Sequence, residues 1–188
     1  MTGQRLPTPP ARRMISAMDP RYPVGKFELD KDATPETRRT CIAQLDALPR
    51  DVAQALARLP PQGLDTPYRA GGWTARQVVH HLADSHMNAY SRIKLALSEE
   101  APALKTYPEE VWAEMPDART ADPAISMSIL EGVHRRLTLQ LEALSPEQFA
   151  RTATHPQWGT ITVDFLVQVY AWHCRHHVAH ITQVRVGG

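Results

Sequence analysis

The chain has 188 residues, 43% of them hydrophobic, which is enough to bury the core of one ordinary domain without disulfide bonds. Its 21 basic and 20 acidic residues leave a formal net charge of +1, so we expect no nucleic-acid partner. No apolar stretch approaches the roughly 20 residues that span a bilayer, so we expect no membrane partner. Only two scattered cysteines occur, Cys41 and Cys174, and the N-terminus lacks an apolar signal segment. These features predict a cytoplasmic protein.

The N-terminal part of the chain divides into a tail and the first helix. Residues 1–22 are rich in proline and show no hydrophobic period, which predicts a flexible tail before a single domain over residues 23–186. The first helix should begin at Thr34-Pro35-Glu36, because a threonine N-cap precedes a proline at the first helical position. Pro49 should break or kink this helix, since proline has no N–H to donate.

The second and third helices follow two linkers. The first linker, Asp65 to Trp73, is rich in proline and glycine, and Thr74 then caps a helix that should run to about Ser98. The second linker is expected to hold a short helical turn near residues 108–115. Asp122-Pro123 opens the third helix, whose apolar stripe has helical spacing: Leu130, Val133, Leu137, Leu141, Leu144.

The last part of the chain predicts one short β element and one long helix. Ser145-Pro146-Glu147 should end the third helix, and residues 152–163 should form a short hairpin or ordered loop. The fourth helix should cover residues 162–184. Four long amphipathic segments predict an all-α fold, an antiparallel four-helix bundle with the hairpin or loop between helices three and four. Bundles of this kind build metal sites in their cores.

Seven of the nine histidines fall within residues 80–86 and 173–180. His173, His177 and His180 continue an apolar stripe of the fourth helix at spacings of three and four, so they should point inward. Residues four apart stand one turn apart on one face, so His173 and His177 can reach a single divalent ion. His176 and His180 have the same spacing, and periodicity alone does not choose between the two pairs. Cys174 points about 100° away from His173 around the helix, so we do not expect it to be a ligand.

The second helix has two faces of different character. Its apolar stripe is Val79, Leu82, His86, Ala89, Ile93, and its polar stripe is Thr74, Val78, His81, Ser85, Asn88, Arg92. A polar stripe usually faces water. The alternative is that it lines a wet cavity inside the bundle, where His81 binds a metal ion and the polar residues beyond it meet a substrate.

The residues around both histidine clusters resemble the YfiT branch of the DinB-like metalloprotein superfamily. The resemblance covers about residues 22–184 and is carried by Asp65-Thr66-Pro67-Tyr68-Arg69, Gly71-Gly72-Trp73-Thr74, Gln77 to Asn88, Trp172-His173 and His176 to Ile181. It implies a four-helix bundle, usually a homodimer, in which one histidine of the second helix and an HxxxH pair of the fourth bind zinc or nickel. The matching ligands are His81, His173 and His177. The other histidines of the two clusters, His80, His86, His176 and His180, then become residues that orient the ligands or support the structure.

The resemblance also implies an activity. The better-defined reaction of the family is transfer of a low-molecular-weight thiol, bacillithiol, to electrophiles, and related bundles use mycothiol or glutathione. On this view Arg92 would pair with a carboxylate of the thiol and Asn88 would hydrogen-bond to it, unless both side chains face solvent.

Two other functions stay open at this point. Members of the family have also been labelled metal-dependent hydrolases, which would use a metal-activated water, and a non-catalytic metal-binding protein is the third possibility. Asp84 and Glu99 are out of phase with His81, so the His81 stripe of the second helix offers no obvious carboxylate base. That favours the transferase.

Overall fold

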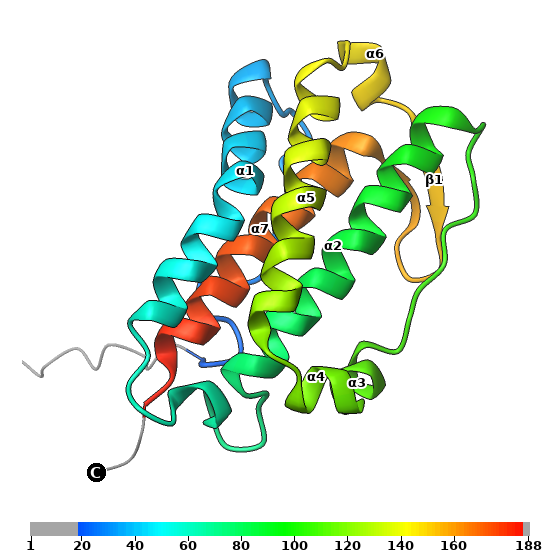
Figure 1. Ribbon diagram of the computed structural model, residues 1–188. Coiled ribbons are helices and arrows are strands. Elements are labelled where there is room, and N and C mark those ends of the chain that lie inside the picture. Colours follow the sequence, from blue (N-terminus) through cyan, green and yellow to red (C-terminus); the bar gives the residue numbers. More distant parts are fainter. Residues whose placement is uncertain (1–18, 186–188) are drawn as a thin grey trace, which may run out of the picture.

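The computed structural model describes residues 19–185 (Figure 1). Four long helices form one bundle: α1 (Pro35–Ala57), α2 (Ala75–Ser98), α5 (Pro123–Glu142), α7 (Val163–Gln183). The connections contain short elements: η1 (Gly63–Asp65), α3 (Glu109–Trp112), α4 (Pro116–Thr120), α6 (Pro146–Phe149), β1 (Thr152–His155), β2 (Gly159–Thr162). The predicted all-α four-helix bundle with a short hairpin before its last helix is confirmed.

The helices α1 and α2 lie diagonally across the bundle, because each of them packs between α5 and α7. Arg38 near the start of α1 pairs with Asp164 near the start of α7, so these two helices run in the same direction. His80 and Ser126 join the starts of α2 and α5, which also run in one direction. The second pair runs opposite to the first (Figure 1). Each long helix therefore has one parallel and one antiparallel neighbour, and the histidines of α2 and α7 face one another across an antiparallel pair.

The helix starts follow the predicted capping chemistry. The side chains of Thr34, Thr74 and Asp122 each accept a hydrogen bond from a backbone N–H in the first turn of α1, α2 and α5. The apolar stripes meet in one core, which includes Leu45, Leu48, Leu82, Ile93, Leu130, Leu137, Leu141, Leu166, Ile181. Burying each such side chain stabilises the fold by about 1.5–3 kcal/mol.

Pro49 does not break α1, which continues from Pro35 to Ala57. A proline cannot donate to the carbonyl four residues before it, which here is the carbonyl of Leu45. That carbonyl instead accepts a hydrogen bond of 2.6 Å from Nδ1 of His134 on α5. The predicted break is therefore wrong, because a side chain from another helix takes the place of the missing backbone donor.

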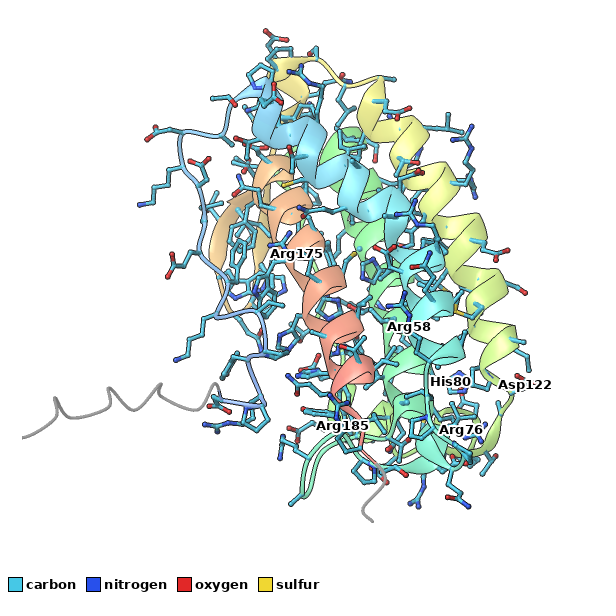
Figure 2. All side chains as sticks on the ribbon, turned by 90° about the vertical axis from the view of Figure 1, so that its left-hand side faces the viewer. Arg58, Arg76, His80, Asp122, Arg175 and Arg185 are labelled. Carbon is cyan, nitrogen blue, oxygen red and sulfur yellow. The ribbon has the colours of Figure 1, made fainter. Side chains whose placement is uncertain are left out.

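Both linkers are fastened to the bundle. Arg76 donates to the carboxylate of Asp65 at 2.7 Å and to the carbonyl of Ala121 at 2.7 Å. His80 also lies against the Ala121 carbonyl, and Arg76, His80 and Asp122 gather at one end of the bundle (Figure 2). These contacts hold the loop before α2 against the connection that leads into α5.

The second linker runs beside the hairpin and then crosses to α2. The N–H of Leu104 donates to the carbonyl of Thr154 at 2.8 Å, so this part of the linker lies beside β1. Gln77 on α2 then donates through its amide to the carbonyl of Ala113 and to the carboxylate of Glu114. Together these bonds hold α3, the predicted helical turn, close to the α2 and α7 side chains that face each other.

The predicted domain boundary at residue 23 stays a prediction. Residues 1–18 of the predicted tail and residues 186–188 lie outside the described residues. Within residues 19–22, Asp19 accepts hydrogen bonds from the backbone and the guanidinium of Arg21, and the ring centroid of Tyr22 lies 6.1 Å from that of His176 on α7. The end of the predicted tail thus contacts the bundle through Tyr22. No helix within residues 19–185 has the length and apolar character needed to cross a membrane.

Candidate metal centre

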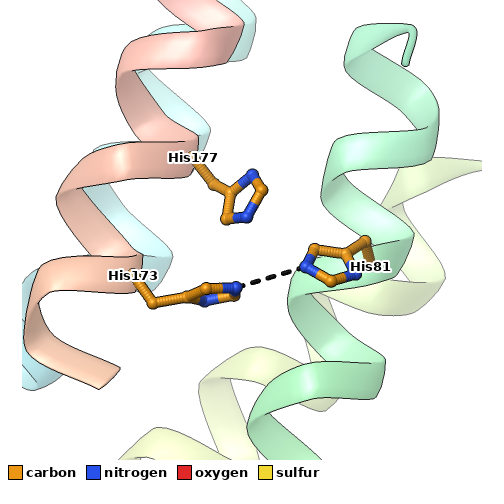
Figure 3. Close-up of side chains that lie close together, drawn as sticks. All are labelled: His81, His173 and His177. Atoms are coloured by element: carbon orange, nitrogen blue, oxygen red, sulfur yellow. Dashed lines mark hydrogen bonds between the residues drawn. The ribbon is translucent and has the colours of Figure 1, made fainter. Parts of the chain in front are cut away.

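The three predicted ligands form one cluster between α2 and α7 (Figure 3). Nε2 of His81 lies 3.2 Å from Nε2 of His173. One ring nitrogen from each of His81, His173 and His177 lies within 4.8 Å of the other two. His173 and His177 are one turn apart on α7, and His81 reaches them from the antiparallel neighbour, so the helix pair itself positions the group.

The chemistry of the cluster fits a divalent metal ion. Burial lowers the pKa of His81 to about 4 and holds the pKa values of His173 and His177 well below the ordinary value for histidine. All three rings are therefore neutral at pH 7, and a neutral imidazole carries the lone pair that a metal ion needs. Two ligands about 2.05 Å from a tetrahedral ion stand about 3.3 Å apart, close to the separation of the His81 and His173 nitrogens.

Within residues 19–185, no cysteine or carboxylate joins these three histidines as a fourth ligand. Cys174 is buried beside His173 in the sequence, but its Sγ lies 4.0 Å from Nε2 of His86 and outside the group. Structural zinc sites are closed by four protein ligands, whereas catalytic sites keep three and leave one position open. An ion held by these three histidines alone would have one coordination position open.

The other HxxxH pair, His176 and His180, forms a second group of histidines together with His177, which also belongs to the first group. Ligand atoms of His176, His177 and His180 also lie within 4.8 Å of one another, and Nδ1 of His180 is 3.3 Å from Nδ1 of His177. Aromatic rings stack on both rival histidines. Trp172 lies 4.5 Å from His176, and Tyr68 lies 3.9 Å from His180.

The cluster opens into a cavity of about 740 Å³, here called the outer cavity. Its aromatic wall comes from Tyr22, Tyr68, Trp73 and Trp172, and Trp73 packs 4.7 Å from the ring of His81. The charged residues that line it are Arg21, Arg69, Glu109, Glu110, Glu114. The cluster therefore opens into a space lined by aromatic rings and by charges of both signs.

A second cavity of about 460 Å³, here called the inner cavity, adjoins the outer one at His173, which lines both. Arg92 lies in it, only 8% exposed. Its guanidinium donates to the hydroxyl of Tyr170 at 2.7 Å and to the carbonyl of Lys105 at 2.6 Å, and its Nε is buried without a partner. Among the ion pairs of the described chain, none includes Arg92. A buried, unpaired cation is costly, so an anionic group bound in this cavity would be stabilised.

The polar stripe of α2 does not face water. His81, Ser85 and Arg92 are buried and line the cavities. Asn88 differs, since it is half-buried, lines neither cavity and donates through Nδ2 to the carbonyl of Asp84 at 2.9 Å. It stands at the edge of the stripe, where a short amide side chain can bond to the preceding turn of its own helix.

The acidic residues of the outer cavity were missed from the sequence. Glu109 lines both cavities, and burial together with the charge of Glu110 raises the pKa of its carboxyl. The sequence-based expectation concerned the His81 stripe of α2, whereas these carboxylates come from the linker. Glu109 lies on the linker. The helical spacing of residues along α2 cannot predict its position, because only the folding of the linker brings Glu109 to the cavity.

Known proteins match almost the whole described chain. Residues 44–181 match the DinB superfamily. Proteins of Bacillus cereus and Bacillus thuringiensis that bear the name "Putative metal-dependent hydrolase" are 46% identical over 167 residues, which cover 89% of this chain and 96% of theirs. The structure of YfiT from Bacillus subtilis, described as a probable metal-dependent hydrolase with an unusual four-helix bundle topology, matches with a TM-score of 0.84 at 44% identity. That match covers 88% of this chain and 95% of YfiT, so the resemblance to the YfiT branch is confirmed. The chain belongs to the DinB superfamily.

Proposed function

We propose that this protein is a metal-dependent transferase that conjugates a low-molecular-weight thiol, similar to bacillithiol, to an electrophile. The observation that carries the proposal is the cluster of three neutral histidines, His81, His173 and His177, which lines the outer cavity and reaches the inner one through His173. These three residues would hold a zinc or nickel ion with one position open, and the ion would lower the pKa of a thiol or a water molecule there, which would supply a nucleophile at neutral pH.

Two adjoining cavities suit a reaction of two substrates. The inner cavity has the unpaired guanidinium of Arg92, which fits a carboxylate of the thiol. Tyr170 and the Lys105 carbonyl hold that guanidinium in place, so it is already oriented before a ligand arrives. The larger outer cavity would then receive the electrophile. Asn88 stays a sequence-based prediction as a substrate contact, and its bond to Asp84 would first have to break.

The chain also offers a proton acceptor and a dry environment. A thiol must lose its proton before it attacks, and Glu109 faces both cavities with a raised pKa, as a general base requires. The rings of Trp73 and Trp172 line the outer cavity, with the Trp73 ring centroid 4.7 Å from that of His81, and so would limit the access of water to a bound substrate. Exclusion of water strengthens the electrostatic interactions of the bound groups.

Hydrolysis is the second candidate function. It is favoured by the carboxylates of Glu109, Glu110 and Glu114 in the outer cavity, because a carboxylate there could take a proton from an attacking water. The names of the Bacillus relatives point the same way. A non-catalytic metal-binding role would call for a fourth protein ligand, and the described residues offer none in the group.

One experiment separates these functions. The zinc and nickel forms are incubated with a model epoxide or alkyl halide and with bacillithiol, mycothiol or glutathione, and the adducts are measured by mass spectrometry. We expect conjugation above the uncatalysed rate, faster with bacillithiol than with glutathione, and absent from both the metal-free protein and His81→Ala. If neither metal form accelerates conjugation while ester or amide substrates are cleaved, the protein is a hydrolase.

A further inference from the structure

We propose that His86 and His180 are positioning residues, which hold the two α7 ligands in the tautomer that presents Nε2 to the metal ion. Nε2 of His86 lies 3.2 Å from Nδ1 of His173, and Nδ1 of His180 lies 3.3 Å from Nδ1 of His177. Both ligands would thus be supported by further neutral histidines in place of the carboxylates or carbonyls that commonly do so. The inference rests on the proposed metal site but not on the reaction.

The contact between His86 and His173 indicates which ring nitrogen of each histidine carries the proton. A hydrogen bond between two neutral imidazoles needs one N–H and one lone pair. Nε2 of His173 faces Nε2 of His81 inside the cluster, so a metal ion would take its lone pair, and the proton of His173 would sit on Nδ1. His86, whose side chain is 0% exposed, must then accept at Nε2 and carry its own proton on Nδ1.

The next histidine in the core has the complementary tautomer. Nδ1 of His134 bonds to the carbonyl of Leu45 at 2.6 Å, and a carbonyl can only accept, so the proton of His134 sits on Nδ1. Its Nε2 then carries a lone pair. The rings of His134 and His86 lie 4.7 Å apart, and their remaining nitrogens, an acceptor and a donor, are both buried without another partner. The tautomers are therefore consistent from the Leu45 carbonyl to the ligand His173.

A similar arrangement supports His177. In Figure 3 one nitrogen of the His177 ring faces the other two ligands and the second nitrogen points away from them. The second nitrogen is Nδ1, which meets His180. Tyr68 stacks on the His180 ring with an interplanar angle of 16° and so restrains its plane. If Nε2 of His177 binds the ion, its proton sits on Nδ1, so Nδ1 of His180 must accept it.

The competing interpretation is a second metal ion bound by His176, His177 and His180. In that case both ring nitrogens of His177 would be ligands: Nε2 would donate a lone pair to the first ion and Nδ1 would donate one to the second. Our proposal puts a proton on this Nδ1. The two interpretations therefore predict different numbers of bound ions, one or two per chain.

Histidine supports differ from carboxylate supports in charge. A carboxylate that accepts from a ligand histidine raises the basicity of that ligand, whereas a neutral imidazole adds no negative charge. His173 and His177 consequently stay neutral ligands whose hydrogen-bond partners, His86 and His180, add no charge, so these partners would leave the positive charge of a bound ion undiminished. Such a site favours an anionic nucleophile over a neutral one.

The test uses the full chain and two readouts other than activity. Metal affinity is measured by competition with a chelator for His86→Leu, His86→Gln, His180→Leu and His180→Gln. Histidine tautomers in the zinc-loaded wild type are read from long-range ¹H–¹⁵N spectra. His80→Gln is the matched control, because His80 is also buried beside a ligand but bonds to Ser126 and Ala121.

We expect one ion per wild-type chain, with His173 and His177 protonated at Nδ1. Removal of a supporting partner commonly lowers metal affinity about 10- to 100-fold. The leucine variants should show such a loss, the glutamine variants a smaller one because an amide oxygen can accept, and the His80→Gln control a change of less than about twofold. If a leucine variant does not fold, the wild-type spectra still decide the tautomers.

Three results would overturn the inference. They are a proton on Nε2 of either α7 ligand, folded leucine variants with wild-type affinity, or a second bound ion that His180→Gln loses. In each case a wild type that still binds a metal ion through His81 leaves the proposed function standing. If the wild type binds the ion but catalyses no conjugation, the proposed transferase function is wrong and the proposed roles of His86 and His180 still stand.

Discussion

His134 donates a hydrogen bond to the carbonyl group that Pro49 leaves without a backbone donor. The bond, 2.6 Å long, joins Nδ1 of His134 on α5 to the carbonyl of Leu45 on α1, four residues before the proline. Both partners are buried. His134 thus replaces the backbone hydrogen bond that α1 lacks at Pro49. Its other ring nitrogen, Nε2, has no hydrogen-bond partner, and its ring lies beside that of His86, next to the metal site.

This relationship can be measured as a coupling between two substitutions. His134→Leu should leave the buried Leu45 carbonyl without a donor and lower the free energy of unfolding by about 1–3 kcal/mol. Pro49→Ala restores a backbone N–H that can bond to the same carbonyl. In the double variant the loss should therefore be smaller than in His134→Leu alone, once the effect of Pro49→Ala is subtracted. Urea denaturation of the metal-free proteins measures all four values, and strictly additive effects would show that the two residues do not share the carbonyl.

The buried His134 also predicts how the stability of the metal-free protein depends on pH. Burial lowers the pKa of His134 to about 4, whereas an unfolded histidine titrates near 6.5. The unfolded chain therefore binds a proton in this interval that the folded chain excludes. The stabilising contribution is complete above pH 6.5 and is lost as the pH falls toward 4.

At about 1.4 kcal/mol for each of the roughly 2.5 pKa units, the loss from His134 amounts to about 3.5 kcal/mol. Urea denaturation at several pH values between 7.5 and 4 should show it for the wild type. His134→Gln should give a shallower slope in the same interval. A variant with the wild-type slope would mean that His134 titrates normally in the folded protein.

The metal ligands predict a simple pattern of binding. His81→Ala, His173→Ala and His177→Ala should each lose stoichiometric metal, because two neutral imidazoles alone hold a divalent ion poorly. His86→Ala should still bind one ion when metal is in excess, since His86 lies outside the three-histidine group. Metal analysis of the purified proteins gives the result. Full retention in any of the first three variants would remove that residue from the ligand set.

The success of the sequence-based predictions depends on how local the signal is. The caps Thr34, Thr74 and Asp122 and the helical stripes act within one or two turns, so the four long helices are evident. The pair His173 and His177 is likewise one turn apart. Glu109 could not be assigned in this way, because its place at the cavities depends on the course of the whole linker.

Pro49 is a second residue whose structural effect depends on a contact distant in the sequence. Its local effect was judged correctly, since it does remove a hydrogen bond from α1. The donor that compensates for it comes from His134, 89 residues away from Leu45 in the sequence. No pattern around the proline announces such a partner, because the contact exists only after α5 has packed on α1.

A homodimer is expected from the family resemblance. The short helices of the second linker present exposed apolar side chains, with Val111 57% and Met115 42% exposed, whereas Tyr107 and Trp112 pack against each other. A contact between two copies would cover such side chains. Light scattering at micromolar concentration should give twice the mass of one chain. A single-chain mass there would remove the dimer without affecting the metal site.

Arg92 predicts a selective effect on an anionic thiol. Its guanidinium is buried in the inner cavity and forms no ion pair, although Glu109 lines the same cavity, so Arg92→Met should leave metal binding intact and remove the cation that a carboxylate would meet. A charge-assisted hydrogen bond contributes about 1.5–3 kcal/mol, so KM for bacillithiol should rise about 10- to 100-fold while kcat changes less. Arg92→Lys should recover part of the loss, because it keeps the charge but not the two parallel donors.

The control for this prediction lies in the substrate as well as in the protein. A small neutral thiol has no carboxylate for Arg92 to bind, so the wild type and Arg92→Met should conjugate it with similar KM. Arg58→Met provides a matched loss of an exposed arginine at the end of α1, away from both cavities, and should leave both thiols unaffected. If Arg92→Met weakens the neutral thiol as much as bacillithiol, the guanidinium supports the shape of the cavity through Tyr170 and Lys105 and does not recognise an anion.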